Sequence, residues 1–235
     1  MNLVGFSQKE YYEIRQYELP FNSPENILHE YFSKVLIPAL NRHGVKNIGV
    51  FETLGDPIPN LVYLFIPYDD VYHYGNILKE LSRDKVYLNS RKFYDSIPQS
   101  NKVYNRYNVS FLTAIDGLPK LIKPKRKSNV FELRIYEGYS EDAVKRKIEM
   151  FNKEELKIFD DTGLYSVFFG EQISGPLMPS LIYMLAFESM EERNVNWKKF
   201  SADPNWKRIS KLDKYSNTVS DIKRTFLIPL KYSQL

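Results

Sequence analysis

One pattern of residues occurs twice in this chain, 119 residues apart. The sequence YEIRQY at residues 12–17 returns as FELRIY at residues 131–136. The same offset pairs Gly44 with Gly163, Glu52 with Glu171, Pro57 with Pro176, Ser82 with Ser201, and Asp84 with Asp203. Repeat units of solenoid proteins span roughly 20 to 50 residues, so a longer unit that occurs only twice indicates a duplicated domain. Pro59 with Pro179 and Tyr63 with Tyr183 pair at 120 residues, which predicts one inserted residue just before the third strand of the second copy.

Both copies show the same order of predicted elements. An alternating strand opens each copy, and a helix that ends at Gly44 or Gly163 follows it. Two strands joined by a turn with Gly and Pro come next, and then a second helix, which begins at Asp69 or Asp70 in one copy and at Ser189 in the other. A last strand is expected at residues 108–114 and 222–230. Strand, helix, strand, strand, helix, strand is the order of the ferredoxin-like fold, so the predicted class is α+β.

The repeat also predicts the domain boundaries. We expect a first ferredoxin-like domain at residues 8–115 and a second at residues 130–235. Residues 116–129 between them are rich in Pro, Lys and Gly, and they are expected to form an exposed basic connector. A solvated linker explains these lysines better than an anionic partner does.

Composition excludes several classes of function. The chain has no cysteine, which rules out disulfides, thiolate metal sites and cysteine nucleophiles. A net charge of +4 is too small and too scattered for a dedicated nucleic-acid protein. No apolar run approaches the roughly 18 residues of a membrane span. The compartment stays open: a soluble cytoplasmic protein is the default expectation, and a trimmed export signal is the alternative.

The opening motif FELRIY, the helix that ends in glycine, the hairpin with Gly and Pro at its tip, and the segment ESMEERNVNWKKFSADPNWKRI resemble the NIPSNAP family. The likeness covers residues 12–230 and is stronger in the second copy, because SRDKVY replaces SADPNW in the first. The resemblance implies a dimeric α/β-barrel architecture in which two tandem ferredoxin-like units of one chain pack sheet to sheet as a pseudo-dimer. It implies no agreed enzymatic activity.

The opening strands carry the candidate site. Strand alternation places Phe131, Leu133 and Ile135 on one face, which we expect to meet the helices. The opposite face is then expected to line the interior of the barrel, and the two copies together would bring these candidate ligand-binding residues there: Glu13, Arg15, Tyr17, Tyr63, Glu132, Arg134, Tyr136 and Tyr183. They are either ion pairs that join the two sheets or a site in which an arginine binds a small carboxylate or phosphate.

The sequence predicts no cofactor, no metal site and no catalytic residue. None of the three histidines has a spacing typical of metal ligands, and His73 is the best candidate for a general acid or base. The favoured function is a non-catalytic module that binds a small ligand or another protein, with a small anionic or aromatic molecule as the expected partner and a homo-oligomer left open. The alternative is a cofactor-independent enzyme that acts on a small aromatic or acidic molecule inside the barrel. RNA binding is a third reading, but an RNP1 pattern is missing.

Overall fold

The first half of the chain folds in the predicted order of elements. The structure is a computed structural model that describes residues 8–21, 24–55, 57–125 and 127–235. Its first half contains strands β1 (Tyr11–Glu18), β2 (Gly49–Thr53), β3 (Leu61–Tyr68) and β4 (Arg106–Ala114). Its helices are α1 (Glu25–Tyr31), α2 (Ile37–Arg42), α3 (Val71–Leu81), α4 (Lys85–Ser90) and α5 (Lys92–Asp95).

The second half repeats this order. Its strands are β5 (Val130–Glu137), β6 (Tyr165–Ser174), β7 (Ser180–Phe187) and β8 (Asp221–Pro229). Its helices are α6 (Glu141–Met150), α7 (Leu156–Thr162), α8 (Met190–Ala202) and α9 (Pro204–Ile209). The α+β class is therefore confirmed.

The helix ends follow the predicted capping residues. Asp70 accepts a hydrogen bond from the His73 backbone N–H, and Ser189 accepts one from Glu192, so these side chains cap α3 and α8. Ser140 caps α6 in the same way. Gly163 closes α7 with a φ of 80°, a left-handed conformation that glycine adopts at little cost.

Each long helix of the repeat contains a π-helical turn at the same place. The turn spans Phe32–Leu36 between α1 and α2, and Phe151–Glu155 between α6 and α7. The sequence predicts a kink at Pro38, but the second copy has Lys157 at the equivalent position and still forms the turn. Proline is therefore not the common cause. The inserted residue of a π-turn re-aims the side chains beside it, and such turns often lie at functional sites.

The strands of the two halves form one closed barrel. Among the described residues, eight antiparallel strands follow the order β1-β3-β2-β8-β5-β7-β6-β4. The first half contributes the neighbours β4-β1-β3-β2 and the second half β8-β5-β7-β6. Edge strands join the halves: Phe51 on β2 lies opposite Pro229 on β8, and Ala114 on β4 lies opposite Gly170 on β6. Closure leaves neither four-stranded sheet with an unpaired edge.

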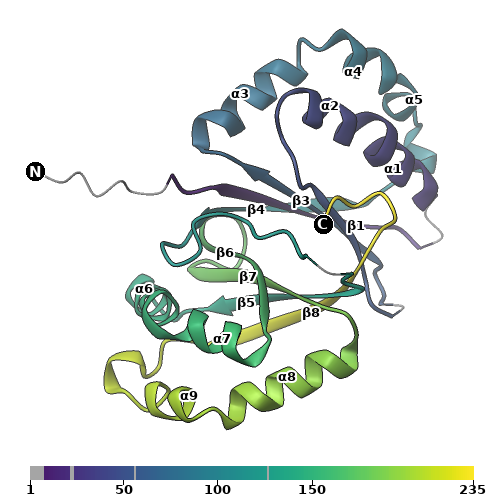
Figure 1. Cartoon of the computed structure of the whole chain (residues 1–235). Coiled ribbons are helices and arrows are strands. Elements are labelled where there is room, and N and C mark those ends of the chain that lie inside the picture. The colour runs from purple at the N-terminus through teal and green to yellow at the C-terminus, as the bar shows by residue number, and fades with distance from the viewer. Residues whose placement is uncertain (1–7, 22–23, 56, 126) are drawn as a thin grey trace, which may run out of the picture.

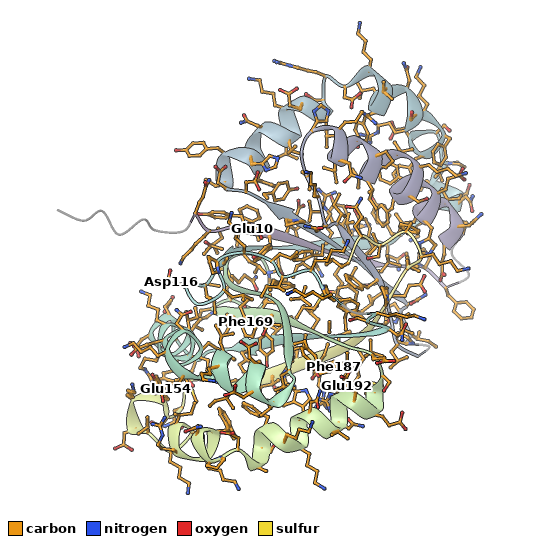
Figure 2. All side chains as sticks on the ribbon, viewed as in Figure 1. Glu10, Asp116, Glu154, Phe169, Phe187 and Glu192 are labelled. Atoms are coloured by element: carbon orange, nitrogen blue, oxygen red, sulfur yellow. The ribbon has the colours of Figure 1, made fainter. Side chains whose placement is uncertain are left out.

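Three apolar cores hold the molecule together. Helices of the first half cover one side of the barrel, and helices of the second half cover the opposite side (Figure 1). One core lies beneath each helix layer. In the second half it includes Phe169 and Phe187, which are labelled in Figure 2. The third core is the barrel interior, packed with buried side chains from both halves: Tyr12, Ile14, Phe51, Phe65, Leu112, Phe131, Leu133, Phe168 and Met184.

The composition of the interior overturns the predicted face assignment. Phe131 and Leu133 point into the barrel, not toward the helices. Tyr136 belongs to the core beneath the second helix layer, as Tyr17 does beneath the first. In a closed barrel the interior is as inaccessible to solvent as the space beneath a helix, so apolar side chains fill it. The polar residues of the opening strands lie outside, where helix side chains can pair with them.

The strand register also corrects one predicted pair. Arg15 lies opposite Leu64, whereas Arg134 lies opposite Tyr183, so Tyr183 corresponds to Leu64 at 119 residues. A shift of one residue moves a strand side chain to the other face. Tyr63 accordingly lies in the barrel interior, where its hydroxyl accepts a hydrogen bond of 3.1 Å from Gln16, and Tyr183 lies outside.

The connector and the C-terminal tail both pack on the barrel. The connector is mostly exposed, but Leu121 N–H donates to Glu10 and Ile122 N–H to Val167. The tail returns to the first half, where the backbone of Gln234 donates to Ile48. Within the described ranges, no helix combines the length and the apolar character needed to cross a membrane.

Candidate functional site

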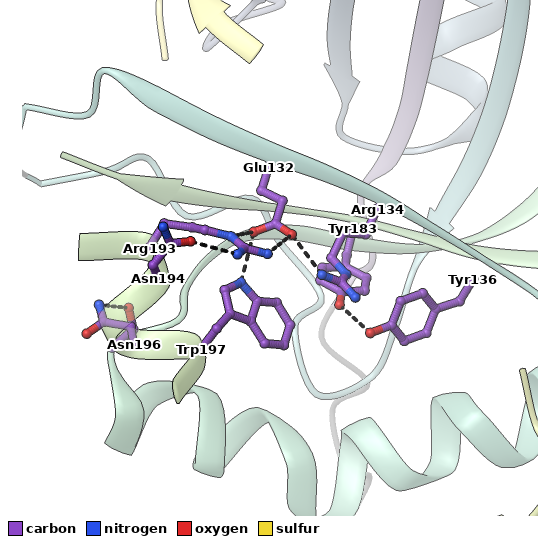
Figure 3. A network of polar contacts seen from close by, with 9 residues as sticks. Glu132, Arg134, Tyr136, Tyr183, Arg193, Asn194, Asn196 and Trp197 are labelled. Atoms are coloured by element: carbon purple, nitrogen blue, oxygen red, sulfur yellow. Dashed lines mark hydrogen bonds and ion pairs between the residues drawn. The ribbon is translucent and has the colours of Figure 1, made fainter. Parts of the chain in front are cut away.

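The structure separates the predicted site residues into two groups on opposite sides of the barrel. Glu132, Arg134, Tyr136 and Tyr183 lie together beneath the helices of the second half (Figure 3). Glu13, Arg15 and Tyr17 lie beneath those of the first half. Tyr63 joins neither group. The prediction that all of them line the barrel interior is wrong for every residue except Tyr63.

Glu132 is the centre of a polar network in the second group. Its carboxylate accepts hydrogen bonds from Arg193 Nε (2.8 Å) and Nη2 (2.9 Å), from Trp197 Nε1 (2.9 Å) and from Arg134 Nη1 (2.7 Å). Arg193 and Trp197 lie one turn apart on α8, which Ser189 starts, so a single helix delivers both donors. Burial favours the neutral acid, but the hydrogen bonds from Arg193 and the charge of Arg134 outweigh it and lower the pKa of Glu132.

Arg134 lies over aromatic rings. Its guanidinium carbon lies 4.4 Å from the centre of the Trp197 ring and 5.4 Å from that of Tyr136. The hydroxyls of Tyr183 and Tyr136 bond to each other at 2.8 Å beside it. Within the part of the chain that the structure describes, the buried Nε of Arg134 has no hydrogen-bond partner. A buried donor left without an acceptor is costly, and it points to an acceptor that arrives with a ligand or with water.

A second ion pair lies a short way along the same helix layer. Lys147 on α6 donates to Glu155 in the π-helical turn at 2.6 Å. Both residues are buried, with 5% and 1% of their surface exposed. Burial raises the pKa of Glu155, and the nearby Lys147 opposes that shift. The ammonium group also lies 4.5 Å from the ring centre of Phe151.

An open cleft of about 520 Å³ connects these groups. Arg134, Lys147 and Glu155 line it together with the apolar side chains Tyr136, Met150, Trp197, Phe200, Trp206 and Tyr215. The buried hydroxyl of Tyr215 also has no hydrogen-bond partner among the described residues. Arg134 on β5 and Tyr215 in the turn before β8, the two residues that carry these unpartnered buried groups, therefore both line the same space. We call it the outer cleft.

The first half has a reduced counterpart of the outer cleft. A pocket of about 240 Å³ includes Arg15 and Tyr68. Arg15 Nε donates to Glu13 at 2.6 Å, and the Tyr68 hydroxyl donates to the same carboxylate at 2.8 Å. At the repeat offset, Leu28 and Leu36 stand in place of Lys147 and Glu155, and Leu78 stands in place of Trp197. The segment after α3 closes this side further, because Tyr94 on α5 stacks on Tyr31 with ring centres 4.0 Å apart.

Several residues of the outer cleft escaped the sequence prediction. Lys147 and Glu155 occupy the positions of the apolar stripe that Val144, Phe151 and Ile158 define, so their charge in that stripe was a detectable signal. Arg193, Trp197 and Tyr215 gave no comparable signal, because helix periodicity does not show which strand residue they meet.

The histidines form contacts that do not involve the outer cleft. His73, the best candidate for an acid or base among the histidines, lines a pocket in the first half, with Nε2 3.4 Å from the His43 carbonyl oxygen and Nδ1 accepting from Asp69 N–H. His43 Nε2 lies 3.1 Å from Asp84.

Comparison with protein-family models gives a match to the half of the chain that carries the outer cleft. The NIPSNAP family model matches residues 131–234. Residues 131–234 thus match a NIPSNAP domain. Comparison with curated proteins gives no match. This domain includes Glu132, Arg134, Lys147 and Glu155, so the whole polar network lies within the matched range.

Solved structures share the fold of the whole chain. A candidate monooxygenase from Fusobacterium nucleatum superposes with a TM-score of 0.62 at 12% identity, over 95% of this chain and 93% of that one. A candidate monooxygenase from Lactobacillus acidophilus gives 0.58 at 15% identity, with 94% of each chain covered. An anthrone oxidase-like protein gives 0.54 at 7% identity, over 94% and 92%. At these identities the likeness shows the fold alone.

Proposed function

We propose that the NIPSNAP domain of this protein binds a small aromatic carboxylate in the outer cleft, as a binding module without catalysis. The observation that carries the proposal is that Arg134 and Tyr215 both line one open cleft, and that each has a buried group without a partner, Arg134 Nε and the Tyr215 hydroxyl. A bound acceptor would remove the cost of both. The prediction of a small anionic or aromatic partner is thus kept, but its site moves from the barrel interior to the helix side.

The charges around the outer cleft favour an anion. Arg134, Arg193 and Lys147 supply three cations, whereas Glu132 and Glu155 supply two carboxylates. One positive charge therefore lacks a counter-charge within this group. A carboxylate suits the guanidinium best, because its two oxygens match the planar fork of arginine.

The walls favour an aromatic body on the ligand. Trp197, Phe200 and Trp206 line the outer cleft, and Phe200 lies 4.5 Å from Trp206 between ring centres. The volume of about 520 Å³ is within the usual range for small-molecule sites, roughly 300 to 1,000 Å³. A flat ring with one acidic group would use both the aromatic walls and the free donor.

A substrate site inside the barrel has little support. The interior is packed with buried side chains such as Phe65, Phe131 and Phe168, and the two arginines lie outside it. The names monooxygenase and anthrone oxidase-like belong to the structural neighbours, and they assign no activity to this chain. A cofactor-independent enzyme would therefore have to use the outer cleft, where each carboxylate already has a cationic partner.

We also propose that the chain consists of two ferredoxin-like units, residues 8–115 and 130–235, that form a pseudo-dimer. Each half contributes four neighbouring strands in the same relative order, and a helix layer covers each half. The site is then expected in one unit alone, because the first unit has leucines where the second has the Lys147–Glu155 pair.

Tryptophan fluorescence tests this function directly. The chain has two tryptophans, and both Trp197 and Trp206 line the outer cleft. We expect 3-phenylpropionate and phenylacetate to change the emission saturably, and the neutral amide phenylacetamide to bind at least 10-fold more weakly. Arg134→Met should weaken binding of the acids by about 10- to 100-fold, in line with about 1.5–3 kcal/mol for a charged hydrogen bond.

The matched control is Arg15→Met in the first half, which should leave the affinity unchanged at a temperature where circular dichroism shows the variant folded. A second control is Lys125→Met in the connector. Equal affinity of Arg134→Met and the parent protein for the acids, or no saturable change with either acid, would refute the proposal.

A further inference from the structure

Three potential metal ligands meet on the first half of the molecule. Glu25 and His29 lie one turn apart on α1, and Glu52 lies on β2. One ligand atom from each residue lies within 4.8 Å of the other two. All three side chains are partly buried, so the cluster is held in place and still open to solvent. Glu52 is far from α1 in the sequence, and only the folded first half brings it there.

The distances suit a small cation. His29 Nε2 lies 3.1 Å from Glu52 Oε1. Two ligands of a tetrahedral zinc ion, each bound at about 2.0–2.2 Å, lie about 3.4 Å apart. A cation can therefore take the place of the proton between this nitrogen and this oxygen with only a small movement of the side chains.

Neighbouring side chains orient the ligands. The Tyr232 hydroxyl lies 2.8 Å from His29 Nδ1, so Nδ1–H can donate to it and leave the Nε2 lone pair facing Glu52. Asn60 Nδ2 donates to Glu25 Oε1 at 2.8 Å, which leaves the second carboxylate oxygen available. A hydrogen bond to the far nitrogen of a ligating histidine is the usual way in which proteins fix its tautomer and ring orientation.

The charge of the cluster also favours a cation. Two carboxylates face one imidazole, and among the ion pairs of the described residues neither Glu25 nor Glu52 pairs with a lysine or an arginine. Elsewhere on the surface, glutamates such as Glu30 and Glu149 pair with a lysine four residues away. A divalent ion would balance the negative charges of Glu25 and Glu52.

The repeat shows that these ligands are specific to the first half. Glu171 stands at the position of Glu52, but Val144 and Ile148 stand at the positions of Glu25 and His29. The second half thus keeps one carboxylate and lacks the other two ligands. The cluster is also separate from the outer cleft, because second-half residues line that cleft and the helices of the two halves lie on opposite sides of the barrel (Figure 1).

We propose that Glu25, His29 and Glu52 bind one divalent transition-metal ion of the zinc type, with water completing its coordination. Two oxygens and one imidazole nitrogen are ligands that Zn²⁺ accepts, and three protein ligands leave one position open. Zinc binding at this cluster does not depend on binding of an aromatic carboxylate in the outer cleft, so either proposal can fail without the other.

Calorimetric titration of the tag-free, full-length chain with Zn²⁺ tests the proposal. We expect one ion per chain, and at least 10-fold weaker binding in each of His29→Gln, Glu52→Gln and Glu25→Gln. Zinc should also raise the unfolding temperature of the parent protein and have a smaller effect on these variants, because a ligand that binds only the folded state stabilises it.

Two matched variants serve as controls. Glu171→Gln removes the equivalent carboxylate of the second half, and His73→Gln removes another histidine that contacts a carboxylate, with Nδ1 3.5 Å from Asp69. Both should bind zinc as the parent does. The proposal is overturned if no stoichiometric binding occurs, if His29→Gln binds zinc with the parent affinity, or if His73→Gln is the variant that loses it.

Discussion

Lys147 Nζ donates a hydrogen bond of 2.6 Å to Glu155 Oε2, and both residues are buried, with 5% and 1% of their surface exposed. At the same two places in the first half, Leu28 and Leu36 pack in an apolar core. One backbone arrangement, including the π-helical turn, therefore accommodates either a buried ion pair or two leucines. The pair is not needed to build the fold, which suggests that it belongs to the chemistry of the outer cleft.

This equivalence predicts an unequal effect of single and double substitutions. Lys147→Leu or Glu155→Leu alone leaves one buried charge without its partner and should lower the free energy of unfolding by about 3–5 kcal/mol. The double variant, which copies the first half, should lie within about 1 kcal/mol of the parent protein or above it. Urea unfolding measures all three. A double variant that loses as much as the two single variants together would contradict the prediction.

The two arginines of the opening strands should differ in their contribution to stability. Arg134→Met leaves Glu132 with both bonds from Arg193 and one from Trp197, so we expect a loss of about 1 kcal/mol. Arg15→Met leaves the buried Glu13 with Tyr68, and the loss should be about 3 kcal/mol. Thermal and urea unfolding measure which of the two variants loses more stability. Equal losses would mean that Arg193 does not compensate for Arg134.

Glu132 should contribute to acid unfolding. Its pKa in the folded protein is lowered, because Arg193 and Arg134 outweigh the effect of burial. Its stabilising contribution is therefore complete above the unfolded pKa, about 4.3, and is lost as the pH falls through the folded value. Glu132→Gln should show a shallower decline of the unfolding free energy below about pH 4.3. Glu80→Gln, at an exposed position of α3, is the control and should keep the slope of the parent.

Tyr215→Phe should separate binding from stability. The Tyr215 hydroxyl is buried and lacks a partner in the described structure, so its removal should leave the free energy of unfolding unchanged or raise it by up to about 1 kcal/mol. The same variant should bind 3-phenylpropionate about 3- to 10-fold more weakly if the hydroxyl donates to the ligand. Reduced stability together with unchanged affinity would show that the hydroxyl has a structural partner and does not reach the ligand.

The elements were predictable because their signals are local. Ser189 and Asp70 cap helices where the sequence predicts, and Gly163 ends one, since each of these functions depends on neighbours only a few residues away. The alternation of the opening strands also divided their residues into two sets, Phe131 with Leu133 and Glu132 with Arg134. That division is correct in the structure.

Which set lies inside the barrel was not predictable from alternation. A period of two gives the same pattern whether the apolar side chains face a helix layer or a closed interior. Barrel closure decided the outcome, because side chains from both halves, such as Phe51 and Phe131, fill one shared space. Glu132, Arg134, Tyr136 and Tyr183 were therefore placed on the wrong side of the sheet, and their role in ligand binding stays a prediction.

The sequence alone determined the order of the elements, the helix ends and the division of strand residues between two faces. Each of these follows from interactions between residues that are close along the chain. Tertiary structure alone decided that Arg193 and Trp197 meet Glu132, and that Glu52 meets His29. These contacts join residues tens of positions apart, and their geometry depends on how the sheet closes and how each helix lies upon it.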